Sequence, residues 1–287
     1  MTPVKVIPVP ESSETDSETN PVDSPDVLPP SPSPDENSDN DNGDNGDMQP
    51  AHQPGSPEQS GEEEHKDEIP VNSGMLLQDL LNDIYHYEED KVAYLTFDDG
   101  PTPHLTDRIL DILKQENVKA TFFPIGYNAE DYPDLIKRVY EEGHGMGNHT
   151  YSHVFKQIYS KPENLVDEFT KTEEILQSIL GEDKNFKLVR FPGGSFGNKL
   201  KPFREAVNKA GFGYIDWNSL NGDAESVKPK PVNKLIARFK ETYKNQCGLI
   251  VLMHDAPGKK TTPEALPEII KFLKGKGYRF ELLPGSR

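Results

Sequence analysis

Two adjacent carboxylates, Asp98 and Asp99, follow 94–97, a run of residues typical of β-strands, and lead at once into Gly100 and Pro101. A β-strand places successive side chains on opposite faces, so a purely structural role would not need both acids. Asp, Gly and Pro are also common turn residues, and a simple turn is the alternative. The strand expected before the pair favours a catalytic role over a turn. In that role one carboxylate binds a divalent cation, and the other takes a proton from water that the cation activates.

A second candidate motif is the pair His149 and His153, four residues apart. On a helical turn, this spacing places both imidazoles on one face, where they can bind one metal ion. Taken alone, such a pair is more often two surface histidines. Together with an acidic pair at another strand end, it predicts a two-histidine, one-carboxylate metal site. A metal site here argues against glycosylation of Asn148, which stands in a formal sequon.

Polar residues at two further strand ends can complete a catalytic site. Arg190, in the stretch RFPGGS, can hold a carboxylate through a charge-assisted contact, and Gly193 and Gly194 let a backbone N–H approach an oxyanion. His254 ends the stretch GLIVLMH and, if an aspartate holds it, can protonate a departing amine. The structural alternatives are a glycine-rich turn with a surface arginine, and a hydrogen-bonded histidine at a strand end.

The segments that must position these residues alternate between strands and helices. Strands are predicted over 91–97, 119–126, 144–149, 186–191, 212–218, 248–254 and 278–283, and helices over 75–87, 102–117, 132–143, 162–181, 201–211, 231–244 and 262–277. This alternation predicts an α/β fold with a parallel sheet, and about seven units in about 200 residues favour a (β/α) barrel, complete or incomplete. Chemistry in such barrels gathers at the C-terminal strand ends, where the candidate residues fall, with Asp223 nearby.

Residues 1–70 differ from the rest of the chain in composition. They hold 18 of the 49 acidic residues, 2 of the 31 Lys and Arg residues, 13 of the 26 prolines and no Phe, Tyr or Trp. Such a segment buries too little apolar surface to offset its ordering entropy, so we predict a disordered acidic linker before one catalytic domain over 71–287. A calcium loop at Asp39, Asp41 and Asp44 is the alternative, but its glycine is one position early and no glutamate closes the loop at the twelfth position.

The remaining features bound the cellular setting. The single cysteine, Cys247, excludes an intrachain disulfide and precedes an apolar run, which favours a packed thiol. No transmembrane span or signal peptide is recognisable, as expected of an extracellular or wall-associated domain whose anchor or signal lies outside this chain; a cytosolic protein would also lack both. We expect a monomer without a nucleic-acid partner, which reaches a membrane only through a segment absent from this chain.

The motifs TFDDGP, HTYSH, RFPGG and LMH, in this order within residues 90–283, resemble the signature blocks of the polysaccharide deacetylases. This is the carbohydrate esterase family that shares the NodB homology domain. The resemblance implies a distorted (β/α) barrel and metal-dependent removal of N- or O-acetyl groups from polysaccharides. It implies that Asp98 is the catalytic base, that Arg190 orients it, and that the metal ligands are Asp99, His149 and His153.

The same resemblance assigns the other side of the site. It implies that His254 is the catalytic acid and that Asp223 orients it. Asp216 and Asp255 are less favoured alternatives as the support of His254. It further implies an oxyanion donor and substrate contacts at Gly193, Pro192, Leu252 and Trp217. Where many family members read Trp-x-x-Asp-x-x-Asp-Trp, this chain reads WNSLNGDA, so Leu220 and Ala224 replace an aspartate and a tryptophan in the substrate groove.

We therefore expect an N-deacetylase that acts on a β-1,4-linked N-acetylhexosamine polymer, with peptidoglycan N-acetylglucosamine as the expected substrate and acetate as the product. Zinc is the expected ion, and cobalt, nickel and manganese suit the same ligands. Chitin deacetylation and acetylxylan esterase activity are alternatives within the family. A glycan-binding wall module without turnover is the non-enzymatic alternative. A non-haem iron oxygenase shares the metal triad but would need neither the second aspartate nor His254.

Overall fold

The computed structural model of this chain describes residues 73–287. The predicted acidic linker and the calcium-loop alternative lie outside these residues, so they and the predicted domain boundaries stay predictions. The strands are β1 (Val92–Asp98), β2 (Thr121–Phe123), β3 (Gly145–Met146), β4 (Leu188–Val189), β5 (Gly213–Tyr214), β6 (Ser219–Leu220), β7 (Gly248–His254) and β8 (Arg279–Phe280). The helices are α1 (Ser73–Asp83), α2 (Leu105–Gln115), α3 (Gly126–Asp131), α4 (Pro133–Glu141), α5 (Phe155–Ile158), α6 (Pro162–Leu180), α7 (Lys201–Lys209), α8 (Val232–Thr242) and α9 (Thr262–Gly275), with short 3₁₀ turns at Ile84–His86 and Asn198–Leu200.

The strands form an incomplete barrel. Every strand pair is parallel, and the larger sheet has the order β3-β2-β1-β7-β6, with β8 beside β1. A separate pair, β4 and β5, meets this sheet through a bridge between Asn148 and Val189. Within residues 73–287, no strand pairing joins β5 to β6, so the barrel stays open there. The predicted α/β fold with a distorted or incomplete (β/α) barrel is confirmed.

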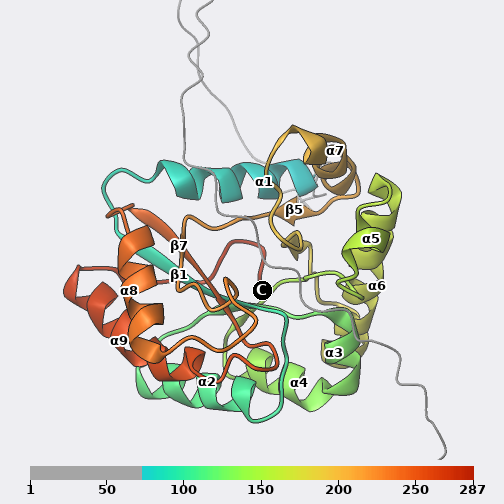
Figure 1. Ribbon diagram of the computed structural model, residues 1–287. Coiled ribbons are helices and arrows are strands. Elements are labelled where there is room, and N and C mark those ends of the chain that lie inside the picture. The colour runs from blue at the N-terminus through green and yellow to red at the C-terminus, as the bar shows by residue number, and fades with distance from the viewer. Residues whose placement is uncertain (1–72) are drawn as a thin grey trace, which may run out of the picture.

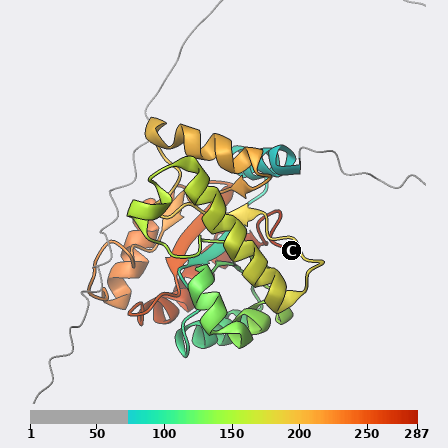
Figure 2. The same ribbon diagram turned by 90° about the vertical axis from the view of Figure 1, so that its right-hand side faces the viewer.

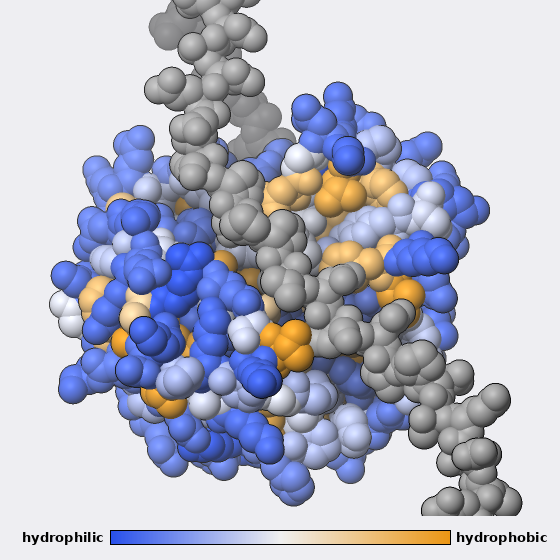
Figure 3. All heavy atoms as spheres, in the orientation of Figure 1, coloured by the Kyte–Doolittle hydropathy of each residue, from blue (hydrophilic) through white to orange (hydrophobic). Residues whose placement is uncertain are grey.

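The helices cover the outside of the strands (Figure 1). In this view α8 and α9 lie at the left, α2 and α4 along the bottom, and α3, α5 and α6 at the right, while α1 crosses the top. Figure 2 shows α6 running diagonally across the outside of the strands. On the face drawn in Figure 3, hydrophilic side chains predominate and the apolar ones form small separate groups. None of the helices between Ser73 and Arg287 combines the length and the hydropathy needed to span a bilayer.

Alternation along the two long strands separates an outer core from an inner one. Ala93, Leu95 and Phe97 of β1 pack against the surrounding helices, whereas Val92 and Tyr94 face the barrel interior, as do alternate residues of β7. Because the side-chain period of a strand is two, the inward series of β1 continues to Asp98 and that of β7 to His254. The pleat of the two strands thus directs both polar side chains to the inner rim.

The predicted strand over 212–218 is wrong in its extent. The structure instead has two short strands, β5 and β6, with a break between them. In the break, the side chain of Asn218 adds to the backbone bond that its own N–H makes with the Ile250 carbonyl at 3.2 Å. Its Nδ2 donates to the Gly248 carbonyl at 2.7 Å, and its Oδ1 accepts from the Ile250 N–H at 2.9 Å. These bonds hold the segment between β5 and β6 beside β7. Helices α3 and α5 are also additions that the sequence pattern did not predict.

Candidate metal centre and catalytic site

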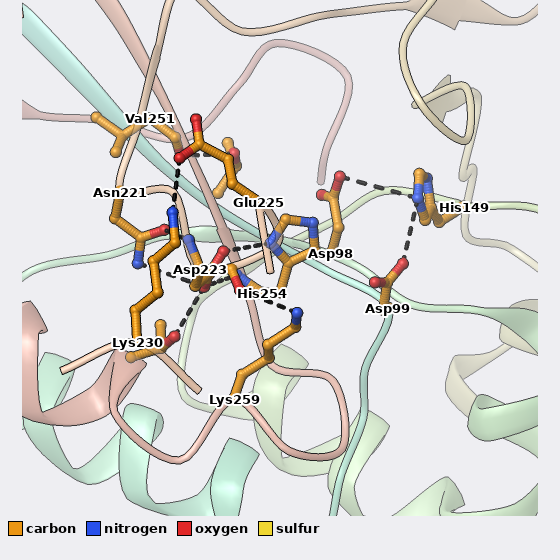
Figure 4. Close-up of polar contacts among 12 residues, drawn as sticks. Asp98, Asp99, His149, Asn221, Asp223, Glu225, Lys230, Val251, His254 and Lys259 are labelled. Atoms are coloured by element: carbon orange, nitrogen blue, oxygen red, sulfur yellow. Dashed lines mark hydrogen bonds and ion pairs between the residues drawn. The ribbon is translucent and has the colours of Figure 1, made fainter. Parts of the chain in front are cut away.

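The two adjacent aspartates face the same site because the backbone turns between them. Asp98 is the last residue of β1, and Asp99 has a left-handed conformation with φ 74°. The Asp99 N–H donates to the Phe123 carbonyl at 3.2 Å, which holds this turn beside β2. As a result, Asp98 Oδ2 and Asp99 Oδ1 lie 3.9 and 3.4 Å from His149 Nε2 (Figure 4).

The prediction that His149 and His153 sit on a helical turn is wrong. Both lie in the loop before α5, where Thr150 and His153 have left-handed backbones with φ 68° and 57°. The Thr150 hydroxyl accepts the His153 N–H at 3.2 Å and closes the loop. The two imidazole rings still meet, with their centroids 5.0 Å apart. The two imidazoles therefore lie together as predicted, but a closed loop with two left-handed residues brings them together, not a helical turn.

Asp99, His149 and His153 form a donor set that fits a divalent cation. One ligand atom from each lies within 4.8 Å of the other two. Asp99 Oδ1 is buried, has no hydrogen-bond partner within residues 73–287, and lies 3.4 and 3.5 Å from the two Nε2 atoms. His149 Nδ1 contacts the Arg190 carbonyl oxygen at 2.8 Å, an arrangement that leaves Nε2 free to bind a metal. Burial lowers the pKa of His149 to about 3, so it is neutral, as a metal ligand must be.

Asp98 is held by a buried arginine rather than by the histidines. Arg190 is fully buried, and its Nη1 donates to Asp98 Oδ1 at 2.9 Å and to the Thr96 hydroxyl at 2.7 Å. Its Nε donates to the Ile215 carbonyl at 3.1 Å. Burial raises the pKa of Asp98, and the charge of Arg190 opposes that rise. One carboxylate oxygen is thus fixed by the arginine, while the other faces the metal-binding residues.

His254 has the partner that the motif predicted. Its Nδ1 lies 2.7 Å from Asp223 Oδ1, and its backbone N–H donates to Asp223 Oδ2 at 3.0 Å. The Thr262 hydroxyl donates to the same Oδ2 at 2.7 Å. Burial acts to lower the pKa of His254, but the Asp223 carboxylate outweighs it and raises that pKa to about 9. The imidazole is therefore protonated at neutral pH and has one fixed orientation.

The two other aspartates considered as supports for His254 bind elsewhere. Asp216 accepts the N–H and the hydroxyl of Ser195 at 2.9 and 2.6 Å. Asp255 accepts the hydroxyl of Thr106 at 2.6 Å. Among the three candidates, only Asp223 contacts the imidazole of His254.

The residues expected at the substrate line the neighbouring loops and strands. Gly193 has a left-handed backbone with φ 75°, and the Pro192 carbonyl accepts the Tyr159 hydroxyl at 2.7 Å. Leu252 is buried on β7 in register with Leu220 of β6. The ring of Trp217 meets that of Phe196 edge-on at 5.4 Å. Their contacts with substrate stay predictions.

Sequence reasoning missed Glu168, which holds the histidine loop from α6. Its carboxylate accepts the N–H groups of Tyr151 and Ser152 at 2.9 and 2.6 Å and the Ser152 hydroxyl at 2.8 Å. No motif marks this residue, since it is one of several acids on a long helix. Asn148, beside the loop, is fully buried and donates to the Phe169 carbonyl at 2.8 Å, which argues against glycosylation there.

Comparison with known proteins supports the resemblance seen in the motifs. The family model described as polysaccharide deacetylase matches residues 86–215. A peptidoglycan-N-acetylglucosamine deacetylase of Bacillus cereus is 38% identical over 199 residues, which span 69% of this chain and 71% of that protein. The solved structure of a Streptococcus mutans CE4 esterase aligns with a TM-score of 0.65 at 33% identity, over 71% of this chain and 90% of that one. A crystallised polysaccharide deacetylase of Bacillus cereus aligns with a TM-score of 0.59 at 38% identity, over 67% and 91% of the two chains.

Proposed function

Because this chain belongs to the polysaccharide deacetylase family and is an enzyme of that family, we propose that it removes the N-acetyl group from N-acetylglucosamine in peptidoglycan and releases acetate. The observation that carries the chemistry is the convergence of three groups: a metal-binding triad, a carboxylate held by a buried arginine, and an imidazole held by a buried carboxylate. The sugar is inferred from the named activity of the Bacillus cereus relative.

We propose that Asp99, His149 and His153 hold a zinc ion, with cobalt, nickel or manganese as alternatives that suit the same ligands. When bound, the cation polarises the acetyl carbonyl and favours ionisation of water. Asp98 accepts a proton from the attacking water through Oδ2, because Arg190 occupies Oδ1. The charge of Arg190 also opposes the rise in the pKa of Asp98 that burial causes, which favours the ionised form that a base requires.

His254 is proposed as the acid that protonates the departing amine. Asp223 fixes the ring through Nδ1, which leaves Nε2 to carry the transferable proton. With a pKa near 9, His254 holds that proton at neutral pH and passes it to the more basic nitrogen that forms as the C–N bond breaks. The Gly193 N–H is proposed as an oxyanion donor, and Pro192, Leu252 and Trp217 as substrate contacts, on the family resemblance.

We propose that the protein acts at the cell wall, outside the cytoplasm, as a monomer. A cell-wall glycan substrate is the basis for this location. Chitin deacetylation and acetylxylan deacetylation use the same chemistry, and no contact in the site favours either of them over peptidoglycan. A binding module without turnover is disfavoured, because the contacts of Arg190 with Asp98 and of Asp223 with His254, beside the metal-binding triad, support a catalytic role.

The test is acetate release by the zinc-loaded protein from a panel of acetylated glycans. The panel contains peptidoglycan, N-acetylglucosamine oligomers and acetylxylan. The proposal predicts release from the N-acetylated substrates, with peptidoglycan preferred, and loss of release after chelation. A clear preference for acetylxylan would overturn the proposed substrate, and tight glycan binding without any acetate release would overturn the proposed activity.

A further inference from the structure

We propose that Asp255, which the mechanism above does not use, is a positioning residue that holds the turn carrying Asp98 and Asp99 against the strand carrying His254. Its backbone N–H donates to the Asp98 carbonyl at 3.1 Å, one step beyond the last register pair of β1 and β7. This inference rests on the proposed function, because the turn that Asp255 holds bears the proposed base and a proposed metal ligand.

The side chain of Asp255 leaves the strand on the face opposite to His254. Strand alternation turns it away from the barrel interior, toward the first turn of α2. There its Oδ2 accepts the hydroxyl of Thr106 at 2.6 Å, and the Thr106 oxygen in turn accepts the N–H of Thr102 at 2.8 Å. These two bonds connect the end of β7 to Thr102, which follows the turn at Asp98 and Asp99. Asp255 and Thr106 are both buried, so water does not compete for these bonds.

The carboxyl group also occupies the space beside the turn itself. A Cβ atom built on Gly100 would lie 2.0 Å from Asp255 Oδ2 and 2.3 Å from its carboxyl carbon. No side chain fits at position 100 while Asp255 keeps this place. Gly100 is therefore needed for close approach, and the backbone directly after Asp99 rests on the Asp255 carboxyl group.

The surroundings of Asp255 indicate a role in shape rather than in charge. Its Oδ1 has no hydrogen-bond partner in the part of the chain that the structure describes. The residue borders a small cavity of about 10 Å³ that is lined mainly by apolar side chains and also by Gly100 and Pro101. Burial raises the pKa of Asp255 to about 7. An uncharged amide of the same shape, which still accepts the Thr106 hydroxyl, should therefore serve nearly as well.

The experiment compares three variants with a matched control. Asp255→Ala removes the carboxyl group, Thr106→Val removes the hydroxyl that links it to Thr102, and Asp255→Asn keeps both shape and acceptor. Val207→Ala, in a buried cluster on α7, serves as the control for a general loss of stability. Zinc affinity is measured without substrate, and kcat and KM for acetate release are measured on the zinc-loaded proteins.

Positioning predicts that Asp255→Ala and Thr106→Val each lose about tenfold or more in zinc affinity and in kcat, with little change in KM, as is usual for residues that orient metal ligands. Asp255→Asn should stay within a fewfold of wild type, and Val207→Ala should lose thermal stability only. Should Asp255→Ala not fold, Thr106→Val and Asp255→Asn still decide the matter. Wild-type zinc affinity and kcat in Thr106→Val, or losses in Asp255→Asn as large as in Asp255→Ala, would overturn the proposal. Wild-type protein that binds zinc but releases no acetate would defeat the proposed function instead, and the zinc affinities would still test Asp255.

Discussion

Asp98 and His254 are register partners at the ends of the adjacent parallel strands β1 and β7. Neighbouring strands lie about 4.8 Å apart, so two inward-facing residues in register must be close. The proposed base and the proposed acid are thus placed by the longest strand pairing of the sheet, where β1 and β7 pair over seven residues each. Their supports come from elsewhere: Arg190 follows β4, and Asp223 follows β6. Each catalytic group can therefore be tested apart from its support.

Asp98→Asn should remove the proton acceptor and leave the metal ligands in place. Because general-base catalysis contributes about 10²–10⁴-fold, acetate release should fall by that factor. Zinc content, measured by elemental analysis, should stay at the wild-type level, since Asp99, His149 and His153 are unchanged. Undiminished acetate release by this variant would show that Asp98 is not the base.

Arg190→Met should affect both stability and the pH profile. It leaves the buried Asp98 carboxylate without its cation, and breaking a buried pair in this way costs about 3–5 kcal/mol of unfolding free energy. Because the guanidinium holds the pKa of Asp98 down against burial, its loss raises that pKa further. The acid limb of the kcat/KM profile should therefore move to higher pH. An acid limb that does not move would show that Arg190 does not control the pKa of the proposed base.

Asp223→Asn should move the alkaline limb of activity to lower pH. The Asp223 carboxylate, working against burial, is what raises the pKa of His254 to about 9, so the amide should let that pKa fall. The raised pKa also stabilises the wild-type fold, fully so below the ordinary value of 6.5, and this stabilisation is lost as pH rises through about 9. Urea unfolding from pH 6 to 10 should show this decline in wild type and a smaller one in the variant. Equal declines would contradict the assignment.

Glu168→Gln should weaken metal binding without unfolding the protein. The amide can accept fewer of the three hydrogen bonds that close the histidine loop, so His149 and His153 lose part of their preorganisation. Residues of this kind typically change metal affinity by about 10–100-fold when mutated, and we expect the lower end. The matched control is Glu174→Gln, an exposed acid on the same helix. If both variants bind zinc as tightly as wild type, Glu168 does not support the site.

The long strands and the residues at their ends could be predicted from the sequence. The runs 91–97 and 248–254 are mostly apolar, and they form β1 and β7 with shifts of at most one residue. Since parallel strands end at one rim, the polar residues after them had to meet there. The ordered family motifs then separated the roles of Asp98 and Asp99, which strand alternation alone cannot do.

Other parts of the site depend on contacts between distant segments. The left-handed backbone of Asp99 is held by the Phe123 carbonyl, and the break between β5 and β6 depends on the side chain of Asn218. The histidine loop is closed by Glu168 from another helix. None of these contacts has a local signature in the sequence. The role of Asp255 could not be predicted from the sequence either. Its position next to His254 suggested that it supports the imidazole, but strand alternation points the two side chains to opposite faces.

The central claim is that one cation binds between Asp99, His149 and His153, with Asp98 beside it as an unbound base. The most direct measurement is anomalous diffraction at the zinc edge from crystals of the zinc-loaded protein. The account predicts a single strong peak about 2.0–2.2 Å from the Asp99 carboxylate and from both Nε2 atoms. It also predicts that Arg190 still holds Asp98. A peak elsewhere, or a structure in which these three side chains point to different places, would contradict the account.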